Sequence, residues 1–170
     1  MDGAFLRVEH WIETGGGWAG PLLAIAALLE SLVVVGVVVP ATPILVALGG
    51  VIAAGHAHPT LLAWAAAGAF LGNWTSYELG TGARRKNLQL PNRLGRQVGQ
   101  VTEALFTRYG AAAIIIGRFL GPAAAVAPFA AGWSAMARWR FLLANAATCV
   151  LWPSIMASLG YFGVEALLRL

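Results

Sequence analysis

The sequence predicts an all-α polytopic membrane protein in which two re-entrant, proline-broken hairpins pack among transmembrane helices. Three observations lead to this fold class. Of the 170 residues, 59% are hydrophobic and only 11% are charged, fractions that lie outside those of a soluble domain. Several apolar stretches are too long to be hidden in one soluble core. Prolines interrupt two of these stretches, so neither forms one simple spanning helix.

The N-terminal segment, residues 1–17, is predicted to be an interfacial helix or a terminal tail. Phe5, Val8 and Ile12 share one helical face, which is typical of a short helix on a membrane surface. The periodic run is short, so a frayed tail remains the alternative. Acidic residues near the start do not match a cleaved secretory signal.

A membrane domain over residues 18–164 begins with a hairpin, residues 18–55, whose only charge is Glu30. As one continuous helix its apolar run would measure about 55 Å, against a hydrocarbon core of about 30 Å. Pro40 and Pro43 mark the interruption. The piece after the prolines is too short to span, which favours a re-entrant hairpin over two crossings.

A span over residues 59–80 follows, with its polar residues at the far end, and a basic amphipathic connector occupies residues 81–108. The connector holds six basic residues, Arg84, Arg85, Lys86, Arg93, Arg96 and Arg108. Under the positive-inside rule, its segment 84–108 is predicted to be cytoplasmic.

The second half repeats this plan. A hairpin over residues 109–133 contains Arg118 and is predicted to break at Gly121-Pro122 and again at Pro128. A span over residues 141–164 has no charge and can kink at Pro153, and residues 165–170 form a tail. Two hairpin-and-span halves indicate an inverted-repeat-like transporter, although residue-level similarity between the halves is weak.

Three blocks of sequence carry a family resemblance: Glu30 with the following VVVPATPILVALGGVIAAG, then GNWTSYELGTGARR, then GRFLGPAAAVAPFAAGWSAMARWRFLLANAATCVLWPSIMASLGYFG. Together they resemble the DedA family, also called the SNARE-associated or VTT domain family, over roughly residues 25–163. The resemblance implies two re-entrant hairpins that face each other in a bacterial inner membrane. It also implies movement of phospholipids or polyprenyl-phosphate carriers between leaflets, coupled in some members to protons.

The chain departs from the family pattern at four points. An expected acidic residue falls on Thr42, and an expected second arginine falls on Ala124. The family's Gly-Asp step reads Gly72-Asn73, and its Pro-Gly step reads Gly121-Pro122. Two members of the usual acid and base set are therefore absent together, which resembles the loss of one ion pair.

Glu30 and Arg118 are the strongest candidates for function. A carboxylate in mid-membrane costs several kcal/mol unless it is paired, protonated or hydrated, and an arginine there must find a partner. We predict that the two side chains meet across the hairpins and that Arg118 exchanges Glu30 for a lipid phosphate. A static structural pair, or an Arg118 that extends to the interface, remains the alternative.

The full candidate substrate or proton site comprises Glu30, Arg118, Pro40, Pro43, Thr42, Gly121, Pro122, Asn73, Glu78 and Asn145. The prolines free backbone carbonyls that can line a polar cavity. The asparagine on the last span either hydrogen-bonds across helices or touches a headgroup.

We expect a transporter, a flippase or scramblase whose partners are the phosphate headgroups of membrane lipids. A proton-coupled transporter of a small solute or ion, or a non-transporting membrane scaffold, remains the alternative. A lone Cys149 and two isolated histidines, His56 and His58, do not make a metal site, and no enzyme motif occurs, so neither metal, cofactor nor enzymatic activity is expected. Nucleic acid is not an expected partner, and a homo-oligomer stays open.

Overall fold

The computed structural model describes residues 18–33, 41–120 and 123–168, and within those ranges the chain is helical with no strand. The N-terminal segment 1–17, together with Pro40, Gly121 and Pro122, lies outside the described residues. The predicted all-α fold class is confirmed.

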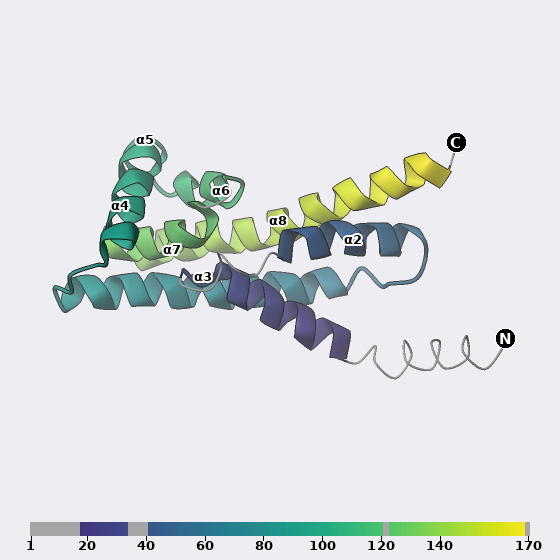
Figure 1. Ribbon diagram of the computed structural model, residues 1–170, viewed down its shortest axis with the longest axis horizontal. Coiled ribbons are helices and arrows are strands. Elements are labelled where there is room, and N and C mark those ends of the chain that lie inside the picture. Colours follow the sequence, from purple (N-terminus) through teal and green to yellow (C-terminus); the bar gives the residue numbers. More distant parts are fainter. Residues whose placement is uncertain (1–17, 34–40, 121–122, 169–170) are drawn as a thin grey trace.

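Two long helices run in opposite directions along the molecule (Figure 1). They are α3, Leu61–Arg85, and α8, Arg138–Leu168. Of the described helices, only one is long and apolar enough to cross a membrane, over Arg138–Ala166. α3 extends past the predicted span 59–80, because its polar last turns pack on a neighbouring helix and end in Arg84 and Arg85, which suit a helix C-terminus.

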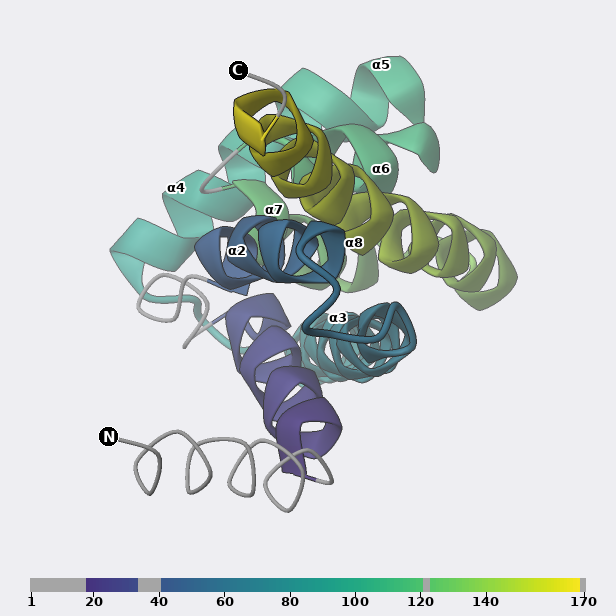
Figure 2. The same cartoon turned by 90° about the vertical axis from the view of Figure 1, so that its right-hand side faces the viewer.

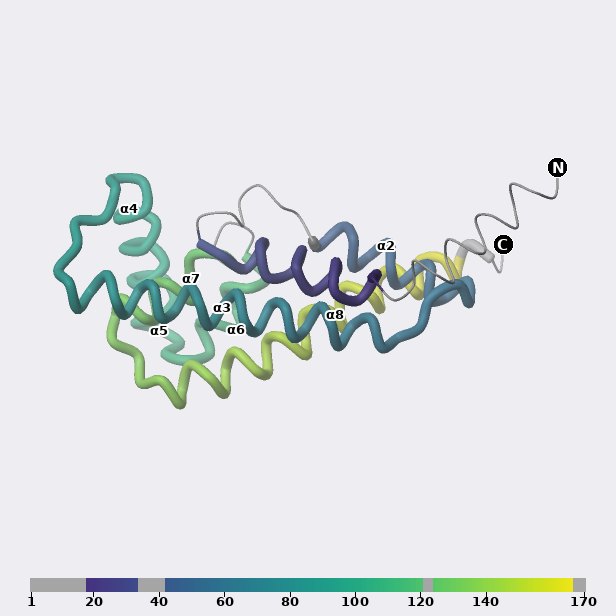
Figure 3. The backbone as a smooth tube through the Cα atoms, turned by 90° about the horizontal axis from the view of Figure 1, so that it is seen from below, coloured from purple at the N-terminus to yellow at the C-terminus, as the bar shows by residue number. Residues whose placement is uncertain are grey.

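The helix Trp18–Ser31 runs toward the middle of the molecule, and α2, Ala41–Ala53, runs back (Figures 1 and 3). Viewed along the long axis, α2 lies between α8 and the helix Trp18–Ser31 (Figure 2). Pro43 falls in the first turn of α2, where a missing N–H costs no intrahelical hydrogen bond.

The connector forms three short consecutive pieces at one end of the molecule (Figure 3). They are α4, Asn92–Val101, a π-helical turn η1, Thr102–Phe106, and α5, Thr107–Tyr109. α4 is amphipathic as predicted, since it buries Val98 and Val101 and exposes its basic side chains.

Two further helices follow, α6, Ala112–Arg118, and α7, Ala123–Trp133. The predicted break at Pro128 is wrong, because α7 continues through this proline. Pro128 is fully buried, and close packing against α3 and α6 holds the helix despite the lost hydrogen bond. α8 likewise continues through Pro153.

The return helix of each half packs on the long helix of the other half, α2 on α8 and α7 on α3. Glycines bring the backbones together. A Cβ added at Gly49 or Gly160 would collide with the carbonyl oxygen of Ala157 or Val46. At Gly132 or Gly80, the collisions would be with the carbonyl oxygens of Tyr77 and Phe129. In all four helices the glycine follows the contacted residue by three positions, so the two crossings have the same pattern.

Candidate functional site

A largely buried group of polar side chains, with one tryptophan, lies where the helix Trp18–Ser31, α2, α3, α6 and α8 meet. We call it the central polar cluster, and it comprises Glu30, Ser31, Thr42, Asn73, Ser76, Arg118, Asn145, Cys149 and Trp152. An apolar protein keeps such a group only when its members satisfy one another or a ligand.

Glu30 lies on the last turn of the helix Trp18–Ser31 and contacts the start of α2. Thr42 Oγ1 donates a hydrogen bond to Glu30 Oε1 over 3.2 Å. At Thr42 the family resemblance implies an acid, and this chain supplies a neutral donor instead. The cluster therefore keeps one carboxylate without placing a second negative charge beside it.

Arg118 ends α6 and is only 7% exposed. Its Nη1 donates to Ser31 Oγ over 3.1 Å, and its Cζ lies 3.8 Å from the centre of the Trp152 ring, a close cation–π contact. Its charge is also attracted by Glu30. The structure thus brings Arg118 and Glu30 into one cluster, with Ser31 as the residue that Arg118 contacts by hydrogen bond.

The end of the helix Trp18–Ser31 is capped by a side chain of α3. Ser76 Oγ donates to the Ser31 carbonyl over 3.0 Å and accepts from Val33 N over 3.2 Å. Helix ends leave such backbone groups without intrahelical partners, and burying them unpaired is costly. Ser76 therefore fixes the helix end that carries Glu30 and Ser31.

Asn73 and Asn145 join α3 to α8 inside the cluster. Asn73 Nδ2 donates to Asn145 Oδ1 over 2.8 Å, and Asn145 Nδ2 donates to the Phe70 carbonyl over 3.2 Å. Cys149 Sγ lies 3.7 Å from Asn73 Nδ2 and 3.3 Å from Asn145 Oδ1. The two predicted asparagines are therefore in direct contact, and the thiol lies against both.

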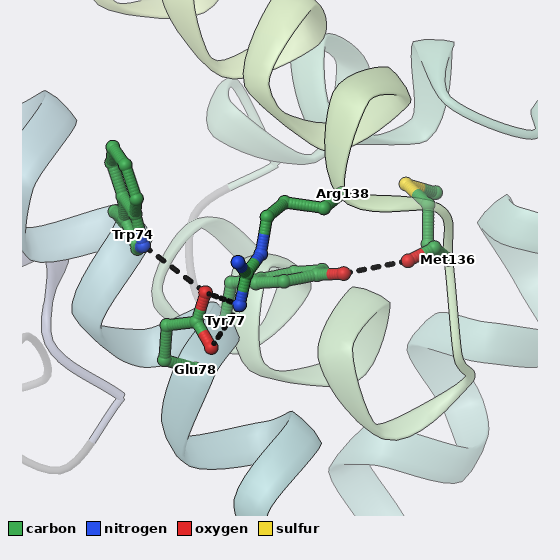
Figure 4. Close-up of polar contacts among 5 residues, drawn as sticks. All are labelled: Trp74, Tyr77, Glu78, Met136 and Arg138. Atoms are coloured by element: carbon green, nitrogen blue, oxygen red, sulfur yellow. Dashed lines mark hydrogen bonds and ion pairs between the residues drawn. The ribbon is translucent and has the colours of Figure 1, made fainter.

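Glu78 lies apart from the central polar cluster, on the outer side of α3. It forms an ion pair of 2.8 Å with Arg138 and accepts a hydrogen bond of 3.2 Å from Trp74 Nε1 (Figure 4). Beside it, Tyr77 donates to the Met136 carbonyl over 2.6 Å. These contacts fasten α3 to the start of α8, and the predicted part of Glu78 in the substrate site stays a prediction.

The remaining predicted residues divide into two groups. Pro43 is exposed at the start of α2, next to Thr42. Pro40, Gly121 and Pro122 are outside the described residues, so their predicted role in lining the site stays a prediction.

Four members of the cluster were missed by sequence reasoning: Ser31, Ser76, Cys149 and Trp152. Two of them carried a usable signal. Ser31 adjoins Glu30, and Ser76 follows Asn73 by three positions, on the same face of α3. A buried tryptophan that covers an arginine has no sequence signature, because any membrane helix contains apolar aromatics.

Comparison with known proteins supplies a family. The VTT domain model matches residues 39–162. The Escherichia coli inner membrane protein YabI is 29% identical over 86% of this chain and 58% of its own length. Inner membrane protein YqjA of the same organism is 30% identical over 82% of this chain and 65% of its own length.

A membrane protein of Buchnera aphidicola is 31% identical over 90% of this chain and 60% of its own length. The chain therefore spans about three fifths of the relatives it matches. No solved structure matches it.

Proposed function

The chain belongs to the VTT domain family, also called the DedA family, and from that membership we propose that it moves phosphate-bearing lipids between the leaflets of a bacterial inner membrane. Location in the inner membrane agrees with the names of its E. coli relatives. The phosphate-bearing lipids are phospholipids or polyprenyl-phosphate carriers.

One observation carries the proposal: a buried arginine is held by a hydroxyl group and an aromatic ring, and one nitrogen of its guanidinium has no hydrogen-bond partner among the described residues. Arg118 bonds to the Ser31 hydroxyl and lies over Trp152, and its Nη2 has no hydrogen-bond partner among the described residues. An arginine arranged in this way is suited to bind a phosphate, whose oxygens accept charge-assisted hydrogen bonds.

Helix lengths support the proposal that the hairpins are re-entrant. α2 has 13 residues and α7 has 11, so they measure about 20 Å and 17 Å, well short of a hydrocarbon core of about 30 Å. The matching crossings of α2 on α8 and of α7 on α3 support an inverted repeat. In such transporters the substrate binds between the repeats, near the membrane midplane.

The proposed mechanism uses the charges of the cluster in turn. A lipid phosphate that enters the cluster takes the place of Glu30 as the counter-ion of Arg118. Protonation of Glu30 would release Arg118 to the phosphate, so a proton gradient could drive the exchange. Basic side chains of the connector would first gather anionic lipids, at about 1 kcal/mol per residue near the surface.

The test is lipid movement by the purified protein in vesicles, with fluorescent phospholipid and polyprenyl phosphate, in the presence and absence of a pH gradient. We expect faster movement than in protein-free vesicles. Solute uptake driven by the gradient without lipid movement would favour a proton-coupled solute transporter. If neither lipid movement nor solute uptake occurs under any gradient, the result would favour a membrane scaffold.

A further inference from the structure

Two buried polar atoms of the central polar cluster have no hydrogen-bond partner among the described residues, Asn73 Oδ1 and Arg118 Nη2. Asn73 is 1% exposed and Arg118 is 7% exposed. Buried polar atoms are almost always paired, since leaving one unpaired costs about 1–3 kcal/mol. One of these atoms is an acceptor and the other is a charged donor, so together they specify what a ligand must offer.

The acceptor is fixed in direction by its neighbours. Asn145 Nδ2 donates to the Phe70 carbonyl, so Asn145 Oδ1 must face Asn73. Asn73 must then present its Nδ2 to that oxygen, which turns Oδ1 away as a free acceptor. A flipped Asn73 amide would set two oxygens against each other, so the orientation follows from the hydrogen-bond chain.

The donor is fixed as well. Ser31 occupies Nη1 of Arg118, and the Trp152 ring covers the face of the guanidinium. Nη2 has no hydrogen-bond partner among the described residues. Ser31 and Trp152 are therefore positioning residues, which hold Arg118 without neutralising its charge.

Asn73 and Arg118 are neighbours in the cluster. Asn73 Nδ2 lies 3.7 Å from Cys149 Sγ, and Arg118 lies over Trp152, one turn further along α8. Ser76, one turn beyond Asn73 on α3, bonds to Ser31, which accepts from Arg118 Nη1. The two side chains are thus held close together by α3, α6 and α8.

We propose that this pair selects lipids whose headgroup carries both a phosphate and an N–H or O–H donor. The phosphate accepts from Arg118 Nη2, and the headgroup donor binds Asn73 Oδ1. Ethanolamine and glycerol headgroups meet both requirements, whereas choline has no such donor. The inference rests on the proposed function and adds its specificity.

The experiment measures the transbilayer rates of three lipids that share the same labelled acyl chains and differ in their headgroups: ethanolamine, glycerol and choline. The wild-type protein should move the first two about tenfold faster than the third, as one added hydrogen bond to a buried acceptor allows. Asn73→Leu should slow the two donor lipids to the choline rate. Thr75→Val, an exposed change on the same helix, should preserve the preference.

A measurement on the wild type alone guards against a variant that does not fold. The soluble phosphodiester methyl phosphoethanolamine should inhibit transport at about tenfold lower concentration than methyl phosphocholine, since only the former carries an N–H donor beside its phosphate. Equal rates for all three lipids in the wild type would overturn the inference and leave lipid transport intact. Water molecules would then be the hydrogen-bond partners of Asn73 Oδ1 and Arg118 Nη2. A preference that survives in folded Asn73→Leu would also overturn it. Absence of any lipid movement would defeat the proposed function itself.

Discussion

The two glycine crossings of the molecule share their backbone contacts and differ in what surrounds them. Each residue of α7 from 125 to 132 is buried, so the α7–α3 crossing is enclosed by protein. α2 instead exposes Pro43, Ile44, Ala47 and Val51 along its length. A cavity of about 180 Å³, lined in part by Gly49 and Ala157, opens beside the α2–α8 crossing.

Polar and aromatic contacts add to the difference. Tyr77, whose carbonyl meets Gly132, donates to the Met136 carbonyl and stacks on Phe141 with ring centres 4.3 Å apart. The α7–α3 crossing is enclosed and held by these contacts, so it provides a fixed support for Asn73, Ser76 and Arg118. The α2–α8 crossing is open, so α2, which carries Thr42, has room to shift. We therefore expect the α2 side to move during transport and the α7 side to hold.

The largest effect is expected from Gly132→Val. The new Cβ would meet the Tyr77 carbonyl, and α7 has no free side toward which to shift. Overpacking and the displaced Tyr77 and Met136 bond together should lower the midpoint of thermal unfolding by about 10 °C or prevent folding altogether. Thermal unfolding in detergent measures this effect. Gly82→Val is the matched control, because an added Cβ there meets nothing within 4 Å.

Gly49→Val should have a smaller effect on stability and a larger one on transport. Its Cβ would press on the Ala157 backbone, but the exposed flank of α2 lets the helix move outward. We expect a folded protein whose unfolding midpoint falls by about 3–5 °C and whose lipid transport is strongly reduced. Gly163→Val, an unhindered site on α8, is the control. Equal destabilisation by Gly49→Val and Gly132→Val would remove the distinction between the crossings.

Tyr77→Phe tests one hydrogen bond beside the α7–α3 crossing. The change removes the hydrogen bond of 2.6 Å to the Met136 carbonyl and keeps the stacking on Phe141. The loss should be about 1–2 kcal/mol, seen as a drop of about 3–6 °C in the unfolding midpoint. An unchanged midpoint would show that packing alone holds α3 to the turn between α7 and α8.

Arg138→Gln should have the smallest effect. The ion pair with Glu78 is largely exposed, with side chains 60% and 36% accessible, so it contributes at most about 1 kcal/mol. Transport should not change, because Glu78 lies outside the central polar cluster. A transport defect in Glu78→Gln and Arg138→Gln alike would return Glu78 to the site.

Much of the fold follows from composition and helix geometry. The charge-free stretches predict apolar helices, and helix lengths separate α3 and α8 from the short return helices. Pro128 was predicted to break α7 because the local rule for proline holds only until tertiary packing compensates for the lost bond. The sequence could not tell that α7 is enclosed and α2 open, since both are apolar and glycine-containing.

Part of the site was also predictable. Glu30 and Arg118 could be predicted because a charged side chain in an apolar segment is costly. Asn73 and Asn145 could be predicted because side-chain amides in apolar helices need hydrogen-bond partners. Their meeting point depends on which faces of five helices converge, a property of packing. The contact between Trp152 and Arg118 and the unpaired oxygen of Asn73 therefore come from the structure alone.

The most direct test of the account compares lipid movement by the wild type, Arg118→Ala and Glu30→Gln in vesicles, with Thr75→Val as the control. If the central polar cluster carries lipid phosphate, folded Arg118→Ala should lose at least about 90% of the rate, because a charge-assisted hydrogen bond is worth about 1.5–3 kcal/mol. Folded Glu30→Gln, which mimics protonated Glu30, should still move lipid but should no longer respond to a pH gradient. The control should keep the wild-type rate. Wild-type rates in folded Arg118→Ala would contradict the central claim, because lipids would then cross without the buried arginine.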